Sequence, residues 1–181
     1  MTTHKKITVI GSGGWGTALA ILLCKKGHNV TLWGSDHVYT DYLREKRENT
    51  KYLKGISIPP EIIITSTISP ALMDAQLIVS ATPTPYLRSV LTKFKKVYSD
   101  GVHIVSVTKG IENDTLMRPS AMITSVLGNH PISVLLGPSH AEEVARGLPT
   151  TVVAASDNNG LARVVQETFT TDRFRVYTNP D

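Results

Sequence analysis

The chain has 181 residues, of which 41% are hydrophobic and 19% charged, and a formal net charge of +4. These values are typical of a soluble globular domain that needs neither disulfides nor a structural metal. The basic residues are spread along the chain rather than gathered in a stripe, so we expect no nucleic-acid partner. No apolar run reaches the roughly 18 residues of a membrane span, so we expect no membrane partner. The single cysteine, Cys24, and the lack of a signal-peptide pattern predict a buried thiol in a reducing cytoplasm.

Strand and helix patterns alternate along almost the whole chain. In chain order, the patterns predict a strand at 6–10, a helix at 15–26, a strand at 29–33, a helix at 37–47, strands at 62–65 and 76–80, a helix starting at Pro85, a strand at 103–107, a helix at 118–127, a strand at 132–136, a helix at 139–146, a strand at 151–155, a helix at 161–169 and a strand at 174–177. Strands that alternate with helices imply βαβ units. We therefore predict an α/β fold over residues 1–181: a Rossmann-like, doubly wound, mostly parallel sheet with helices on both faces.

A glycine-rich segment, GSGGWG, joins the first predicted strand to the first predicted helix. Gly11, Gly13 and Gly16 fit the pattern G-x-G-x-x-G, in which the first glycine permits a tight turn. The second lets the backbone approach a pyrophosphate, and the third lets the helix pack closely. Because the pattern follows a strand and opens a helix, it predicts a dinucleotide site at the helix amino terminus. The alternative is a glycine-rich turn without a ligand.

The end of the second predicted strand, LWGSD, bears on the choice of coenzyme. An acidic residue at this point selects NAD, whereas its absence permits NADP. Ser35 stands there, and Asp36 comes one or two positions late. Ser35 can hydrogen-bond a ribose hydroxyl or a 2′-phosphate, and Lys51 and Lys54 are candidates to reach a phosphate from the next loop. We therefore expect NADP or NAD as coenzyme, with NADPH favoured.

Two further segments follow predicted strands. Lys109 comes directly after the strand at 103–107, and in doubly wound sheets ligands collect at the carboxyl ends of strands. A solvated surface lysine is the alternative. The segment SATPTP, with Pro83, makes either a rigid wall beside a nicotinamide or an ordinary helix-start loop.

The segment GPSHAEEVARG begins another predicted helix. Ser139 and Glu142 have the spacing of a capping box, and the same turn offers main-chain amides and a hydroxyl to an anion. A rival interpretation is a degraded nucleophile elbow with Ser139 as a hydrolase nucleophile, but no Asp and His pair follows it. The histidines are scattered, so we expect no metal site.

Together these stretches resemble the N-terminal domain of the bacterial NAD(P)-dependent glycerol-3-phosphate dehydrogenases. The resemblance is carried, in order, by GSGGWGTALA, VTLWGSD, NTKYLKGI, VSATPTP, TKGIE, GPSHAEEVARGLPT and FRVYTNPD. It implies reversible hydride transfer between NAD(P)H and dihydroxyacetone phosphate, giving sn-glycerol 3-phosphate for phospholipid synthesis. Lys54, where the family has proline, and Thr84, where it often has serine, depart from the pattern.

The resemblance also implies the site residues. The implied coenzyme contacts are Gly11, Ser12, Gly13, Gly14, Trp15, Gly16, Ser35, Tyr52, Pro83, Lys109 and Ala141, and the implied substrate contacts are Lys109, Gly137 and Ser139. The general acid/base lysine is expected beyond Asp181 with a helical substrate domain, so no catalytic residue is assigned and the fragment alone is expected to be inactive. A homodimer of the full-length protein is compatible with the resemblance. The alternatives are a related Rossmann dehydrogenase of another keto substrate and a nucleotide-binding module without chemistry.

Overall fold

An eight-stranded sheet runs through the structure, a computed structural model that describes residues 4–98 and 101–180. Its strands lie in the spatial order β10 (Phe174–Asn179), β9 (Thr150–Ala155), β8 (Ile132–Leu136), β7 (His103–Ser106), β6 (Leu77–Ser80), β1 (Lys6–Ile10), β2 (Asn29–Trp33) and β5 (Ile63–Thr65). Neighbouring strands pair in parallel except β8 and β9, which are antiparallel. The prediction of a mostly parallel sheet is therefore confirmed.

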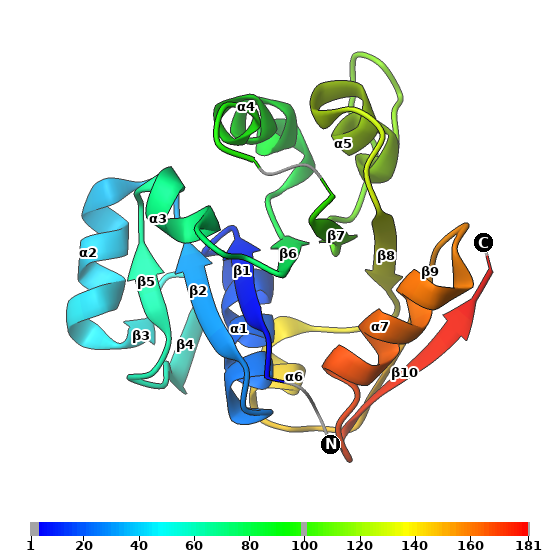
Figure 1. Ribbon diagram of the computed structural model, residues 1–181. Helices are drawn as coiled ribbons and strands as arrows, with labels where there is room; N and C mark the ends of the chain where they lie inside the picture. Colours follow the sequence, from blue (N-terminus) through cyan, green and yellow to red (C-terminus); the bar gives the residue numbers. More distant parts are fainter. Residues whose placement is uncertain (1–3, 99–100, 181) are drawn as a thin grey trace.

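Helices cover both faces of this sheet, as predicted (Figure 1). One face carries α1 (Gly14–Lys25), α2 (His37–Lys46), α6 (Ala141–Ala145) and α7 (Asn159–Phe169), and the other carries α3 (Ile68–Leu72), α4 (Thr84–Lys95) and α5 (Pro119–Leu127). Each layer has its own apolar core. Leu19 and Phe169 belong to the first core, whereas Phe94 and Met122 belong to the second. This two-sided burial is what near-continuous apolar strands require.

Helix α1 forms the centre of the first layer. Every residue from Gly16 to Leu23 is buried, because the helix lies against the sheet on one side and against α6 on the other. Gly27, with φ of 93°, ends the helix as predicted: its amide donates to the Cys24 carbonyl, and the His28 amide donates to the Leu23 carbonyl. The expectation of a buried Cys24 is only half right, since its side chain is half-buried. That burial raises the pKa of the thiol.

A small hairpin between α2 and β5 was not foreseen. Strands β3 (Glu48–Asn49) and β4 (Leu53–Ser57) form their own two-stranded sheet beside the amino-terminal end of α1. A strand of two residues is too short to show an alternating pattern, so periodicity could not reveal it. The hairpin matters because its loop, 50–52, lies against the glycine-rich turn.

Candidate functional site

The carboxyl ends of β1, β6 and β7 and the loop after β8 border one cleft. Its volume is about 430 Å³, and it is lined by Trp15, residues 81–85, residues 107–110 and residues 139–141. The cleft thus brings together Trp15, Pro83, Lys109, Ser139 and Ala141, which come from widely separated parts of the sequence. A cleft at this edge is where open α/β sheets bind their ligands.

The glycine-rich turn leads into Trp15, which lines this cleft, and leaves no room for side chains at three of its four glycines. A Cβ at Gly16 would lie 1.9 Å from the carbonyl oxygen of Gly11, and one at Gly14 would lie 2.5 Å from the carbonyl oxygen of Tyr52. Gly11 has φ of 119°, and its Cβ would lie 2.7 Å from the carbonyl oxygen of Ala81. The turn is therefore packed tightly against the end of β6 and the hairpin loop. This packing explains why the turn contains so many glycines.

Gly13 differs from the other glycines of the turn. Its backbone is extended, with φ of −71°, and a Cβ built on it would meet no atom within 4 Å. The space that a side chain would occupy is therefore open. Gly13 is also the N-cap of α1, which has no side-chain cap, and the first amides of a helix lack intrahelical partners. An open space beside uncapped amides at the positive end of a helix suits a dinucleotide pyrophosphate, so these residues fit the coenzyme that the turn implies.

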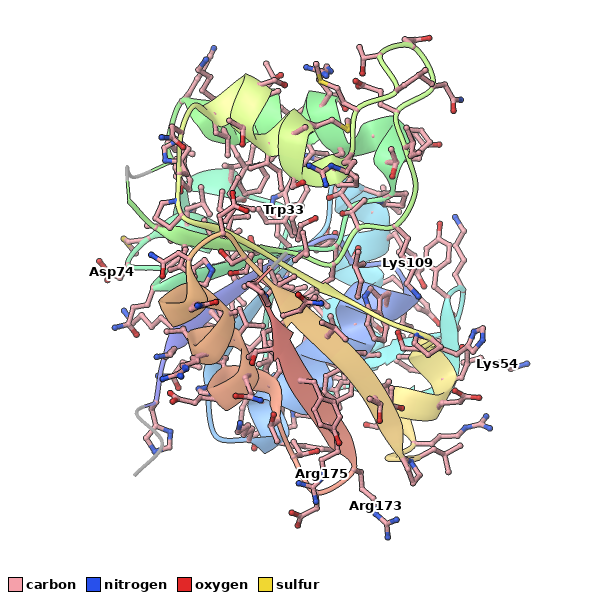
Figure 2. All side chains as sticks on the ribbon, turned by 90° about the vertical axis from the view of Figure 1, so that its right-hand side faces the viewer. Trp33, Lys54, Asp74, Lys109, Arg173 and Arg175 are labelled. Carbon is pink, nitrogen blue, oxygen red and sulfur yellow. The ribbon has the colours of Figure 1, made fainter. Side chains whose placement is uncertain are left out.

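Lys109 ties two sides of the cleft together. Its Nζ donates to the carbonyl oxygens of Ser139 at 3.2 Å and Gly137 at 3.4 Å, and lies 5.7 Å from the centre of the Trp15 ring. Lys109, which is labelled in Figure 2, lies in the loop that follows β7. Both of these hydrogen-bond partners are neutral carbonyls, which contribute no negative charge beside the ammonium. Trp15 adds a buried indole Nε1 that has no hydrogen-bond partner among the residues that the structure describes.

Ser139 lies in this cleft but does not cap the helix as expected. Helix α6 begins at Ala141 with His140 as the N-cap, so the capping box of Ser139 with Glu142 is wrong. The Ser139 hydroxyl instead donates to the carbonyl of Gly137 at 3.3 Å. Within the described residues it makes no hydrogen bond to a histidine, which gives the nucleophile elbow no support. Gly137 is also sterically required, since a Cβ there would lie 2.9 Å from the carbonyl oxygen of Thr151.

Ser35 and Tyr52 are not among the residues that line the cleft. Ser35 is exposed directly after β2, and a Cβ on the preceding Gly34 would lie 2.5 Å from the Ser12 hydroxyl oxygen. Tyr52, on the hairpin loop, is exposed and packs edge-on against Tyr39. Asp36 is the N-cap of α2, where its carboxylate accepts a hydrogen bond from the Tyr39 amide at 3.0 Å.

Asn49 is a site residue that the motif analysis missed. Its side chain is fully buried and donates to the carbonyl of Ser12 at 3.0 Å and to the hydroxyl of Thr17 at 2.8 Å. Its Oδ1 accepts from the Tyr39 hydroxyl at 2.7 Å and the Tyr52 amide at 3.2 Å. Asn49 therefore fixes the hairpin on the glycine-rich turn. No spacing rule marks a lone asparagine, so only the contacts reveal this role.

Side chains of α4 form hydrogen bonds to the loop that carries Lys109. Thr84 donates to the Lys109 carbonyl at 2.6 Å. Arg88 makes a two-pronged pair with Glu112, with Nε to Oε1 at 2.8 Å and Nη2 to Oε2 at 2.6 Å. Hydrogen bonds from Arg88 and Thr115 lower the pKa of Glu112 to about 2.

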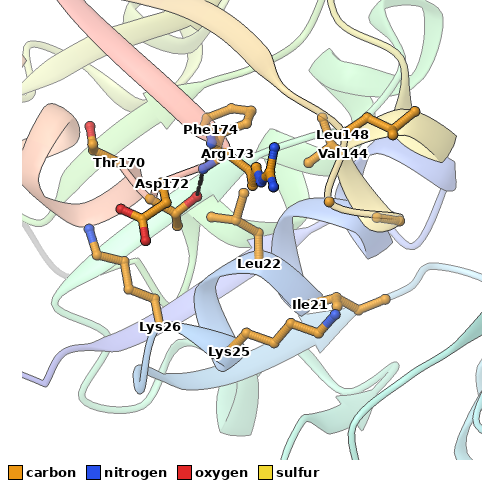
Figure 3. A pocket seen from close by; sticks show the side chains of 13 residues that line it. Ile21, Leu22, Lys25, Lys26, Val144, Leu148, Thr170, Asp172, Arg173 and Phe174 are labelled. Carbon is orange, nitrogen blue, oxygen red and sulfur yellow. Dashed lines mark hydrogen bonds between the residues drawn. The ribbon is translucent and has the colours of Figure 1, made fainter.

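A second cavity, of about 480 Å³, lies between the carboxyl-terminal half of α1, α6 and the turn before β10 (Figure 3). Ile21, Leu22 and Phe174 give it apolar walls, and Lys25 and Arg173 lie among its lining residues. None of the residues predicted to contact coenzyme or substrate lines it, so it is separate from the candidate site. Among residues 4–98 and 101–180, no helix is long and apolar enough to cross a membrane, and no three metal-ligating side chains cluster.

A doubly wound sheet whose first turn is glycine-rich and opens on a cleft at the strand ends defines a dinucleotide-binding domain of the Rossmann class. Residues 6–162 match the family described as the NAD-dependent glycerol-3-phosphate dehydrogenase N-terminus. The chain therefore belongs to that family.

Individual relatives agree with this assignment. The chain is 44% identical over 178 residues to the glycerol-3-phosphate dehydrogenase [NAD(P)+] of Carboxydothermus hydrogenoformans, covering 97% of this chain and 53% of the relative. The enzyme of the same name from Bacillus cytotoxicus is 45% identical over 179 residues, with 97% and 52% covered. The crystal structure of glycerol-3-phosphate dehydrogenase from Coxiella burnetii superposes with a TM-score of 0.93 at 31% identity, covering 98% of this chain and 55% of that one. The chain thus spans about half the length of the relatives it matches.

Proposed function

We propose that this chain is the coenzyme-binding half of a cytoplasmic NAD(P)-dependent glycerol-3-phosphate dehydrogenase. The observation that carries the proposal is the uncapped amino terminus of α1, with open space at Gly13, beside the cleft that contains Lys109. The relatives are named glycerol-3-phosphate dehydrogenase [NAD(P)+], which supports the substrate class. Because the chain spans about half the length of these relatives, the proposal assigns the helical substrate domain and the proton-transfer lysine that the resemblance implies to the other half.

In this proposal the coenzyme's phosphates lie against the main chain of Gly13 and Gly14, where helix amides and the helix dipole hold anions. A bound nicotinamide supplies or accepts the hydride. Pro83 borders the cleft as a rigid wall, and Lys109 offers an ammonium that is already oriented by two carbonyl oxygens. That charge attracts the phosphate of dihydroxyacetone phosphate and stabilises negative charge that develops on its carbonyl oxygen. We assign Lys109 this electrostatic role and not that of the general acid.

The substitution Gly13→Asp tests the proposal. The extended backbone at this N-cap position accepts aspartate, which is a preferred N-cap residue, so the free protein should unfold at the same temperature or slightly higher. A carboxylate there occupies the open space and repels phosphates, because like charges in contact cost several kcal/mol. The affinity for NADH and NADPH should therefore fall by roughly 100-fold.

Gly13→Asn is the matched control, because it has the same shape and no charge. Its loss of affinity should be clearly smaller than that of Gly13→Asp. The measurement is a titration of reduced coenzyme by fluorescence, with a thermal melt of each free variant. Unchanged coenzyme binding in Gly13→Asp would contradict the placement of the phosphates, and a wild-type chain that binds neither coenzyme would contradict the proposed function.

A further inference from the structure

Several cationic side chains follow β2, and most of them are engaged in holding the structure. The Arg44 guanidinium pairs with Asp41 at 2.9 Å and also donates to the Ile64 carbonyl at 3.1 Å. Arg47 donates to the carbonyl oxygens of Pro59 and Ile62. Lys46 pairs with the neighbouring Glu45 at 2.7 Å. These three cations are therefore already committed to partners.

Lys51 has different surroundings. It lies on the loop between β3 and β4, and its Nζ is 4.9 Å from the centre of the Tyr52 ring and 5.8 Å from that of Tyr39. A hydrogen bond with the Tyr52 side chain raises the pKa of Lys51, so its ammonium is charged throughout the neutral range. The ion pairs within the described residues do not include Lys51. Aromatic faces hold this cation in place without neutralising it.

The loop that carries Lys51 is fixed relative to the end of β2. The main-chain amide of Lys51 donates a hydrogen bond to the Tyr39 hydroxyl at 3.1 Å, which restrains the loop. The Tyr39 amide in turn donates to the carboxylate of Asp36, the N-cap of α2. Asp36 directly follows Ser35 in the segment after β2. Asn49 fastens the same loop to the glycine-rich turn. Lys51 is thus held beside the segment that follows β2.

We propose that Lys51 is a specificity-determining residue that recognises the 2′-phosphate of NADP, together with the exposed hydroxyl of Ser35. The inference rests on the proposed function, because the residues after the second strand of a Rossmann domain face the adenosine ribose. A 2′-phosphate adds a phosphomonoester dianion, and an ammonium with no carboxylate partner is complementary to it. The nearby Asp36 carboxylate opposes this attraction in part, but it is engaged at the amino terminus of α2, where the helix dipole offsets its charge.

Lys51→Gln tests this role, because it removes the charge and keeps a polar side chain that is only one atom shorter. The affinity for NADPH should fall by roughly tenfold, the size expected for one partly exposed charge-assisted hydrogen bond. The affinity for NADH should change by less than about twofold, since NADH has no 2′-phosphate for the lysine to contact. Lys51→Arg should retain most of the NADPH affinity. Both affinities are measured by coenzyme fluorescence, with the ligand-induced shift in melting temperature as a second readout.

Lys54→Gln is the matched control. The sequence alone made Lys54 a second candidate for this phosphate, but Lys54 lies on β4 of the same hairpin, is exposed, and stands at the outer edge of the molecule (Figure 2). Lys54→Gln removes the same charge from the same hairpin and should leave the affinities for NADH and NADPH within about twofold of the wild type. The inference is overturned if Lys51→Gln weakens NADH and NADPH equally, if it leaves NADPH binding unchanged, or if the wild type prefers NADH. In each of these cases the coenzyme still binds and the proposed function stands, whereas a chain that binds neither coenzyme defeats the function itself.

Discussion

The side-chain amide of Asn49 donates a hydrogen bond of 3.0 Å to the main-chain carbonyl of Ser12. This contact joins the hairpin to the glycine-rich turn, two segments that lie 37 positions apart in the sequence. Both oxygen and nitrogen of the Asn49 amide are satisfied, although the residue is fully buried. A buried polar group with all its partners present specifies one arrangement of the segments it joins.

Asn49→Ala should therefore lower the free energy of unfolding by about 2–4 kcal/mol, because it removes several buried hydrogen bonds and leaves their partners unpaired. Coenzyme affinity should fall as well, since the hairpin loses its anchor on the turn. The control is Asn158→Ala, which removes an exposed side chain that caps α7 through the Gly160 amide at 2.9 Å. It should cost only about 1 kcal/mol and leave coenzyme binding intact. Urea denaturation measures the first quantity, and equal losses in the two variants would argue against the anchoring role.

Gly16→Ala should disrupt the fold where Gly13→Ala does not. The added Cβ at Gly16 would lie 1.9 Å from a main-chain oxygen that cannot move independently of the turn, whereas the Cβ at Gly13 meets open space. We expect Gly16→Ala to destabilise the chain by about 3 kcal/mol or more, which is at the upper end for overpacking. Gly13→Ala should change stability by less than about 1 kcal/mol. Similar melting temperatures for the two variants would show that the turn relaxes more easily than its contacts indicate.

His103 should make the stability of the protein fall in mild acid. Burial in β7, with a smaller contribution from the charge of Lys5, lowers the pKa of His103 from 6.5 to about 4. Between these values the unfolded chain binds a proton that the folded chain does not, so lowering the pH destabilises the fold by at most about 1.4 kcal/mol per pH unit. Above pH 6.5 the effect is absent, since both states are neutral. Burial also lowers the pKa of His28, which adds to the slope in the same direction.

His103→Gln should flatten this pH dependence without abolishing it, because His28 still contributes. The Nε2 of His103 lies 2.8 Å from the Ser133 hydroxyl, and glutamine offers polar atoms to the same partner. His140→Gln is the control, since it makes the same substitution at an exposed histidine. The measurement is urea denaturation at a series of pH values from roughly 4.5 to 7.5, which is the window that the folded and unfolded pKa values set. A slope in His103→Gln equal to that of the wild type would assign the effect elsewhere.

Arg88→Met should loosen the segment 109–117 that carries Lys109. Arg88 makes two hydrogen bonds to the Glu112 carboxylate. The segment also has hydrogen bonds within itself, such as that from the Glu112 amide to the Met117 carbonyl at 3.0 Å. Hydrogen–deuterium exchange in 109–117 should become faster while exchange in the sheet is unchanged. Lys46→Met, which removes an exposed pair with Glu45, should affect neither region.

The pair of Arg88 with Glu112 also depends on pH. Because the pKa of Glu112 is lowered from 4.5 to about 2, the contribution of the pair to folding stability is present above pH 4.5 and is lost as the pH falls toward 2.

Local sequence patterns anticipated most of the elements for identifiable reasons. Strands β2 and β8 match their predicted bounds, because apolar runs bounded by turn residues are a short-range signal. The end of α1 at Gly27 was equally local, since a glycine with positive φ is a chemical signal within one turn. The start of α6 was misjudged because Ser139 bonds to Gly137 in the turn instead of capping the helix. That choice depends on the packing of Gly137 against the neighbouring β9, which no local pattern contains.

The sequence by itself determined the alternation of strands and helices, the glycine-rich turn and therefore the doubly wound class, since each of these depends on interactions between residues close together in the chain. Only the tertiary structure decided that Lys109 meets the turn at Ser139, that Asn49 holds the hairpin against Ser12, and that the Lys51 amide bonds the Tyr39 hydroxyl. These relationships depend on the order of strands in the sheet and on the packing of α1 against its neighbours. Contacts between distant segments form only when the whole core closes, so they leave no periodic trace in the sequence.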